Sequence, residues 1–176
     1  MIAAEEGGKH LSTEELITTC ILLLNAGHEA TVHTMGNGVK TLLEQGIQTI
    51  DARVIEEVLR FDPPLHIFSR WAQEDVTLLG HDFKRGDQVN CLLAAANHDP
   101  LAYPDPGKFD PARKGPQMTS FGGGIHFCVG APLARLELLN ALQILWARCP
   151  DLALAEPPIY ADVYHFHGLE RLMVTR

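Results

Sequence analysis

The ten residues from Phe121 to Gly130, Phe-Gly-Gly-Gly-Ile-His-Phe-Cys-Val-Gly, constrain the fold of this chain more than any other segment. The glycines at positions 122, 123, 124 and 130 permit positive φ angles and the close approach of a flat, bulky ligand. Pro132 follows and suits the first turn of a helix. The N-terminus of a helix favours a thiolate, because its N–H groups are unpaired and its dipole is positive there. The pattern therefore predicts a loop that brings Cys128 to the mouth of a helix, with His126 able to donate to an anionic group.

Other interpretations of this loop can be weighed from the residues alone. A glycine-rich turn in which Cys128 is a bystander stays open. Zinc would require three or four ligands at short spacing, and no such cluster surrounds Cys128 in the sequence. A phosphate-binding loop would read G-x-x-x-x-G-K-[ST], which is absent. A peroxidatic thiol is disfavoured because no resolving cysteine lies nearby in the sequence.

Composition and charge limit the classes of partner. The 176 residues carry a net charge of −8 with histidine neutral, and the sequence pI is about 5.5. Nucleic acids and anionic membranes require a basic field, so neither is expected as a partner. The densest apolar run, Cys20 to Leu24, is far shorter than the roughly 20 residues that cross a bilayer. The four cysteines form no C-x-x-C pair, which favours reduced thiols and a cytoplasmic location.

A long helix is predicted near the N-terminus. Ser12 and Glu15 have the S-x-x-E spacing of a capping box, and no proline interrupts the stretch from Leu16 to Leu43. Apolar residues occupy every face of the helix between Leu16 and Ala26. We therefore expect the first half of this helix to be buried.

The remainder of the chain is predicted to contain a second helix, short strands, a proline-rich meander and a closing helix. Asp51 can cap the second helix, and Pro63 ends it. We expect these elements at residues 51–61 (helix), 67–71, 76–79 and 88–93 (strands), 97–117 (meander), 132–145 (helix) and 152–176 (short strands). No repeat or linker is visible, so we expect a single domain over residues 1–176.

The cysteine loop is similar to the haem-binding loop of the cytochromes P450, whose pattern is F-x-x-G-x-H-x-C-x-G. Phe121, Gly124, His126, Cys128 and Gly130 match this pattern position for position. The resemblance implies haem b (iron protoporphyrin IX) as the cofactor, Cys128 as the axial thiolate on the iron, and His126 in contact with a haem propionate. Phe121, Gly124 and Gly130 would be further cofactor-binding residues. Thiolate ligation favours O–O cleavage, which allows this family to insert oxygen into C–H bonds.

Further segments resemble the same family in the same order. Glu57 and Arg60 are similar to its E-x-x-R helix, and their spacing places both on one helix face. Arg113, in a segment similar to the family's F-x-P-x-R meander, would complete a buried structural network with that pair. Arg70 resembles a strand arginine that binds a haem propionate, although an ordinary surface arginine fits the residues equally well. Residues 65–68 would then face the substrate cavity.

The long helix resembles the distal helix of the family, with the pattern [AG]-G-x-[DE]-T. Gly27 and Glu29 fit this pattern and would leave room for oxygen and supply protons. Ala30 stands where the family has threonine, and Thr31 follows it. One residue turns a helix by about 100°, so Thr31 does not simply replace that hydroxyl. Our hypothesis is that a substrate hydroxyl or an ordered water does, and we take Gly27, Glu29 and Thr31 as the candidate catalytic residues.

The resemblance implies a mainly α fold with small β-sheets. It would be the C-terminal portion of the cytochrome P450 fold, with the distal helix, the E-x-x-R helix, the meander, the cysteine loop and a final helix. Members of the family are usually more than twice as long, so the chain is expected to be their haem-binding half. The implied function is that of a haem-thiolate monooxygenase, which activates O2 at haem iron and inserts one oxygen atom into a small organic substrate.

The partners follow from the same resemblance. Electrons would come from a ferredoxin or a flavoprotein reductase, and the N-terminal half of the fold would have to be supplied. The alternative is a non-catalytic haem-binding or structural remnant that self-associates as a homo-oligomer, because a distal helix without its usual cover would expose a large apolar patch. Whether the chain is itself an enzyme depends on which of these two hypotheses holds.

Overall fold

The computed structural model describes residues 5–6, 9–163 and 165–176, and its longest element is the helix α1, Thr13–Glu44. The predicted capping box is present: the Ser12 hydroxyl accepts from the Glu15 N–H at 3.2 Å, and the Glu15 carboxylate accepts from the Ser12 N–H at 2.8 Å. These bonds satisfy two N–H groups that a helix start leaves unpaired. The prediction of a long N-terminal helix is therefore confirmed.

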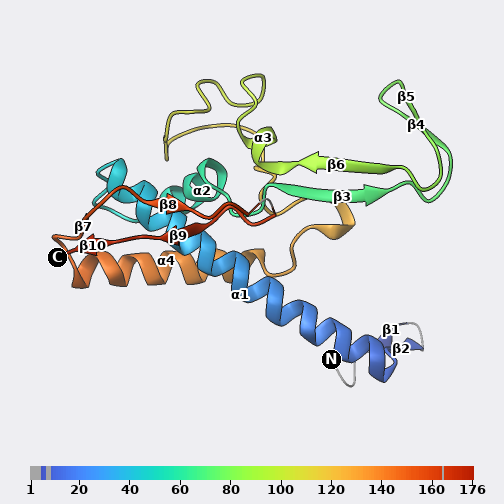
Figure 1. Ribbon diagram of the computed structural model, residues 1–176, viewed down its shortest axis with the longest axis horizontal. Helices are drawn as coiled ribbons and strands as arrows, with labels where there is room; N and C mark the ends of the chain where they lie inside the picture. The colour runs from blue at the N-terminus through green and yellow to red at the C-terminus, as the bar shows by residue number, and fades with distance from the viewer. Residues whose placement is uncertain (1–4, 7–8, 164) are drawn as a thin grey trace.

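The prediction that the first half of α1 is buried is wrong. The buried residues of α1 all lie in its second half, from Thr34 to Leu42. The first half exposes Cys20 and five large apolar side chains, which are Ile17, Ile21, Leu22, Leu23 and Leu24. Figure 1 shows this half projecting away from the rest of the molecule. An apolar sequence indicates that a helix surface can be buried, but it does not indicate whether other residues of the same chain pack against that surface.

Two further helices pack against the second half of α1. Helix α2, Ala52–Phe61, begins at Asp51, whose carboxylate accepts from two N–H groups of the first turn, and it ends before Pro63 as predicted. Helix α4, Ala131–Arg148, carries Pro132 in its first turn. The core lies between the three helices and includes Leu42, Val58 and Leu142, all fully buried.

The strands form small antiparallel pairs. Strand β3, Ile67–Trp71, pairs with β6, Gln88–Leu92, and this ribbon continues into the hairpin of β4, Val76–Leu78, and β5, His81–Phe83. The remaining pairs are β1, Glu5–Glu6, with β2, Lys9–His10; β7, Ala153–Leu154, with β10, Val174–Thr175; and β8, Ile159–Tyr160, with β9, Leu169–Arg171. Strand β5 is a short element that was not predicted. Cys91 on β6 is exposed.

A meander joins the ribbon to the cysteine loop. It follows the short helix α3, Leu93–Asn97, and it contains neither helix nor strand until the 3-10 turn η1, Gly124–His126. The predicted fold class, mainly α with small β-sheets, is confirmed. Within the residues that the structure describes, no helix is both long and apolar enough to cross a membrane.

Candidate functional site

The cysteine loop is a tight, internally bonded turn at the start of α4. The Cys128 N–H donates to the Phe121 carbonyl at 3.0 Å, and the Cys128 carbonyl accepts from the Ala131 N–H at 3.2 Å. Gly122 and Gly124 have φ angles of +69° and +64°, a region that residues with a Cβ rarely adopt. The two glycines thus allow the chain to close on itself, and the thiol of Cys128 is held at the mouth of the helix.

The surface around the thiol is apolar and open. Cys128 is a free, half-buried cysteine, and the neighbouring side chains of Ile125 and Val129 are 97% and 84% exposed. Around Gly123 and Gly124, no described atom lies within 4 Å of the position that a Cβ would take. The loop therefore presents a sulfur atom on an uncovered apolar face.

Phe121, the first residue of the loop, is held by contacts of its ring. The guanidinium of Arg135 on α4 lies 4.6 Å from the centre of the Phe121 ring, and the Phe127 ring lies 6.3 Å away. A cation over an aromatic face is attracted by the electron density of the ring. Phe121 thus joins the loop to the helix that follows it.

Two cationic or titratable candidates, Arg70 and His126, lack an acidic partner. No carboxylate of the described residues lies within 4 Å of either side chain, and both are exposed. Arg70 on β3 donates to its neighbour's carbonyl, Ser69, at 2.9 Å and lies over the Phe68 ring. In the view of Figure 1 the cysteine loop passes between β3 and α1. Both side chains are therefore available to an anionic ligand.

The candidate catalytic residues lie on the exposed first half of α1 and its border. Glu29 is exposed, and apart from the adjacent residues and backbone of the helix itself no described atom lies within 4 Å of where a Cβ of Gly27 would be. The Thr31 hydroxyl donates to the Gly27 carbonyl at 2.7 Å, a bond within the helix. Ala30 is half-buried. The Thr31 proton is thus already engaged, which supports the view that this hydroxyl does not take over the role of a threonine at position 30.

The predicted structural network is assembled in the core. Glu57 accepts two hydrogen bonds from Arg60, and its Oε1 also accepts from the Asp110 N–H at 2.9 Å and from Arg113 Nε at 3.5 Å. Arg60 donates to the Asn97 carbonyl, and Arg113 donates to the Lys108 carbonyl at 2.7 Å. Three charged side chains from α2 and the meander therefore fix the path of the meander that leads to the cysteine loop.

Sequence reasoning missed the polar residues that tie this meander to α2 and α3. Asn97, fully buried, accepts from the Thr119 N–H at 2.7 Å and donates to the Ser120 hydroxyl at 2.7 Å. Ser120 in turn donates to the Leu59 carbonyl at 2.6 Å. These bonds hold the residues that directly precede Phe121. No spacing in the sequence signals them, because the partners are 22 to 61 residues apart.

Comparison with known proteins identifies the class. The cytochrome P450 family model matches residues 51–149, which include α2, the meander, the cysteine loop and α4. The chain belongs to the cytochrome P450 family. It is 40% identical to the biotin biosynthesis cytochrome P450 of Bacillus subtilis over 94% of its own length and 44% of that protein. It is 41% identical to the vitamin D(3) 25-hydroxylase of Pseudonocardia autotrophica, over 99% of this chain and 46% of that protein.

Solved structures agree with this placement. The bacillaene polyketide synthase cytochrome P450 PksS of Bacillus subtilis superposes with a TM-score of 0.90 at 38% identity, covering 98% of this chain and 48% of that one. P450BioI, solved in complex with an acyl carrier protein carrying hexadec-9Z-enoic acid, gives a TM-score of 0.87 at 39% identity, over 94% of this chain and 45% of that one. The chain thus spans less than half the length of these relatives. Within that span it has their C-terminal fold, as predicted.

Family membership implies a haem cofactor, and the residues present are compatible with one. Cys128 offers a single soft sulfur ligand, which suits iron already held by a porphyrin. The glycine-lined apolar face beside it leaves room for a flat macrocycle. Arg70 and His126 have no carboxylate partner among the described residues, so both could donate hydrogen bonds to an anionic substituent of such a group.

Proposed function

We propose that this chain is the haem-binding half of a haem-thiolate monooxygenase that inserts one oxygen atom into a small organic substrate. The observation that carries the proposal is the free, half-buried Cys128 at the mouth of α4, inside a loop closed by two left-handed glycines. When bound, the haem supplies the iron at which dioxygen is reduced, and a thiolate ligand favours cleavage of the O–O bond. The chain's own residues bind and orient that group.

Each candidate residue has a role in this proposal. Cys128 donates its sulfur, and the start of α4 stabilises the negative charge there. Arg70 and His126 hold the propionates by charge-assisted hydrogen bonds, the stronger kind. The network of Glu57, Arg60 and Arg113 holds the meander, and Phe121, Gly124 and Gly130 give the loop its shape beside the cofactor.

Proton delivery is assigned to the first half of α1. Gly27 leaves space next to the helix, and the exposed Glu29 carries protons from solvent. Ala30 offers no hydroxyl, and the Thr31 hydroxyl is bonded to Gly27. A hydroxyl of the substrate or an ordered water then completes the path. In the holoprotein supplied with electrons from NAD(P)H, substrates that lack a hydroxyl should leave part of the reduced oxygen to escape as hydrogen peroxide. Ala30→Thr is expected to lower the amount of hydrogen peroxide released per NAD(P)H consumed with such substrates. If the unmodified protein releases no hydrogen peroxide with them, this path is contradicted.

The whole protein requires partners beyond this chain. A ferredoxin or a flavoprotein reductase supplies the electrons, and the polypeptide that corresponds to the other half of the relatives covers α1. A small molecule is the substrate. The names of the relatives, which include a hydroxylase and proteins of biotin and polyketide biosynthesis, support a small-molecule substrate without selecting one.

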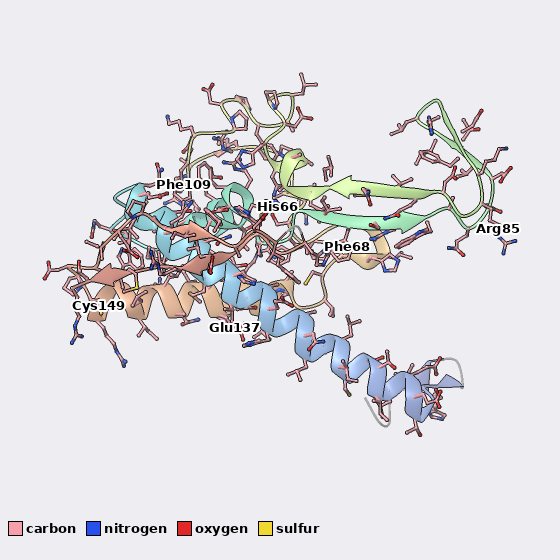
Figure 2. All side chains as sticks on the ribbon, viewed as in Figure 1. His66, Phe68, Arg85, Phe109, Glu137 and Cys149 are labelled. Carbon is pink, nitrogen blue, oxygen red and sulfur yellow. The ribbon has the colours of Figure 1, made fainter. Side chains whose placement is uncertain are left out.

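Absorbance spectroscopy of the purified chain with added haem tests the proposal. The reduced, carbon monoxide-treated protein should give the red-shifted Soret band that requires a thiolate on iron. Cys128→Ser should lose that band, whereas Cys149→Ser should keep it, because Cys149 is also a free, half-buried cysteine but lies at the far end of α4. Figure 2 shows Cys149 at that end. An unchanged band in Cys128→Ser would end the assignment.

The alternative is a non-catalytic remnant that self-associates. The exposed apolar side chains on the first half of α1 favour it, because a monomer rarely keeps a large apolar patch in water. Ile21→Glu together with Leu24→Glu should convert an oligomer into a monomer without changing the haem spectrum. A monomeric unmodified chain that shows the thiolate band would leave only the oxygenase proposal.

A further inference from the structure

Histidines gather around one short segment that the proposed function does not use, the C-terminal segment of residues 165–168. His165 and His167 belong to it, His33 on α1 stacks on Phe166, and His66 stacks on His167. His98, which follows α3, lines a cavity of about 300 Å³ together with His66 and His167. Five of the nine histidines of the chain thus lie in or beside this segment, two within it and three around it. Histidine is the side chain whose ordinary pKa, about 6.5, lies near physiological pH.

Backbone hydrogen bonds dock this segment onto the residues that follow α2. The His167 N–H donates to the Pro64 carbonyl at 2.6 Å, and Phe166 forms an isolated antiparallel bridge with Leu65. From α1, the Asn37 side chain donates to the His167 carbonyl at 2.9 Å. The C-terminal segment therefore lies against residues 64–66, and two of these, Leu65 and His66, belong to the stretch 65–68 that we expect to face the substrate cavity.

The side chains around His167 offer little negative charge. Asp62 is the carboxylate nearest to it, with 3.5 Å between Asp62 Oδ1 and His167 Nε2. The other Asp62 oxygen already accepts from Lys40 at 3.1 Å and from the Tyr160 hydroxyl at 2.5 Å. Glu44 also pairs with Lys40, with 3.5 Å between its carboxylate and the ammonium group. The Asp62 carboxylate thus pairs with the Lys40 ammonium through one oxygen, and its other oxygen can pair with one further cation.

A second proton in this cluster is disfavoured. The rings of His66 and His167 stack with their centres 4.4 Å apart, so two imidazolium ions would repel each other at close range. Burial lowers the pKa of His66, and the positive charges of His167 and His98 lower it further, while Asp62 opposes the shift. A histidine whose pKa is lowered in the folded state contributes stability above its ordinary pKa. That stability is lost as the pH falls through the lowered value.

We propose that His66 and His167 form a proton-operated latch that releases the C-terminal segment from residues 64–66 when both rings are charged. A single positive charge in the pair has a counter-charge, because Asp62 Oδ1 lies 3.5 Å from His167 Nε2. Proton uptake by His66 then places two cations in contact, and the bond from His167 to Pro64 opens. The latch consists of residues of this chain alone. That its release would change the width of the substrate cavity rests on the proposed function.

Amide hydrogen exchange of the haem-free 176-residue chain, followed by NMR, tests the latch directly. The protection factor of the His167 amide should fall about tenfold between pH 7.5 and pH 5.5, which corresponds to about 1.4 kcal/mol of lost docking free energy. The Leu142 amide in the core of α4 should keep its protection. In His66→Phe, which keeps a ring for stacking but cannot be charged, the His167 amide should stay protected at pH 5.5. His66→Gln provides the same test without a ring.

The matched control is His81→Phe. His81 lies on the β4–β5 hairpin in an edge-to-face contact with Phe83, so its removal should leave the pH response of His167 unchanged. A His167 amide equally protected at both pH values would overturn the latch, as would a loss that persists in the His66 variants. An equal loss at Leu142 would overturn it too, because the whole fold would then be opening. Haem binding takes no part in any of these readouts, so the latch and the proposed function can fail separately.

Discussion

Glu57 and Arg60 face each other one turn apart on α2 and form a two-pronged ion pair, with bonds of 2.8 Å and 2.7 Å, although only 4% and 3% of the side chains are exposed. Removing one partner of a buried pair leaves the other charge without compensation, which costs about 3–5 kcal/mol. Glu57→Gln keeps the shape but leaves Arg60 and Arg113 without their carboxylate. We expect its free energy of unfolding, measured by urea denaturation, to fall by about that amount.

The adjacent residue supplies the control. Glu56 also pairs with an arginine, Arg135, but the two side chains are 48% and 31% exposed. Exposed ion pairs contribute less than about 1 kcal/mol. Glu56→Gln should therefore change the stability far less than Glu57→Gln, and equal losses would show that burial is not what makes the Glu57 network important.

The parts of the fold that could be predicted are those with a local signal. The capping box at Ser12, the N-cap at Asp51 and the E-x-x-R spacing act over three or four residues, and the structure has each of them. The exposure of the first half of α1 could not be predicted, because the burial of an apolar helix depends on what lies beside it. The tether from Asn97 to Ser120 was invisible for a related reason: it joins residues that only the folded chain brings together.

The cysteine loop could be predicted because its chemistry is concentrated in ten consecutive residues. Its glycines, cysteine and following proline each leave a mark in the sequence. The cluster around Asp62 draws instead on Lys40 of α1, Tyr160 of β8 and His167 of the C-terminal segment. None of these side chains has a neighbour in sequence that signals its partner, so the cluster appeared only in the structure.

Gly168 tests how closely the C-terminal segment approaches α1. A Cβ added there would lie 1.8 Å from Nδ1 of His33, and His33 is held by stacking on Phe166. We expect Gly168→Ala to lower the free energy of unfolding by about 2 kcal/mol, as overpacking does. In a His33→Ala background the same change should cost much less. Gly107→Ala, at an open position of the meander, is the control and should change stability by less than about 1 kcal/mol.

Tyr160 tests the hydrogen bond to Asp62 without disturbing the packing. Burial and the bond to Asp62 raise the pKa of Tyr160, so its hydroxyl remains a donor at neutral pH. Tyr160→Phe keeps the ring that stacks on His167 and removes the hydroxyl that donates to the Asp62 carboxylate, at a cost of about 1.5–3 kcal/mol. Tyr103→Phe removes a 3.2 Å bond to the neutral Pro116 carbonyl and should cost about 1 kcal/mol. Thermal unfolding of the two variants should rank them in that order; the reverse order would mean that Tyr160 does not donate to Asp62 in solution.

Arg70 tests the proposed cofactor site apart from its sulfur ligand. Its guanidinium is exposed and bonded only to a neighbouring carbonyl, so Arg70→Gln should leave the stability of the haem-free chain within about 0.5 kcal/mol. A hydrogen bond to a charged group contributes about 1.5–3 kcal/mol, and 1.4 kcal/mol corresponds to a tenfold change in affinity. The dissociation constant for haem, measured by absorbance titration, should therefore rise at least about tenfold. Arg85→Gln is the matched control, because Arg85 lies at the far end of the ribbon (Figure 2). Equal haem affinity in both variants would remove Arg70 from the site while leaving Cys128 as its ligand, since the two residues act on different parts of the cofactor.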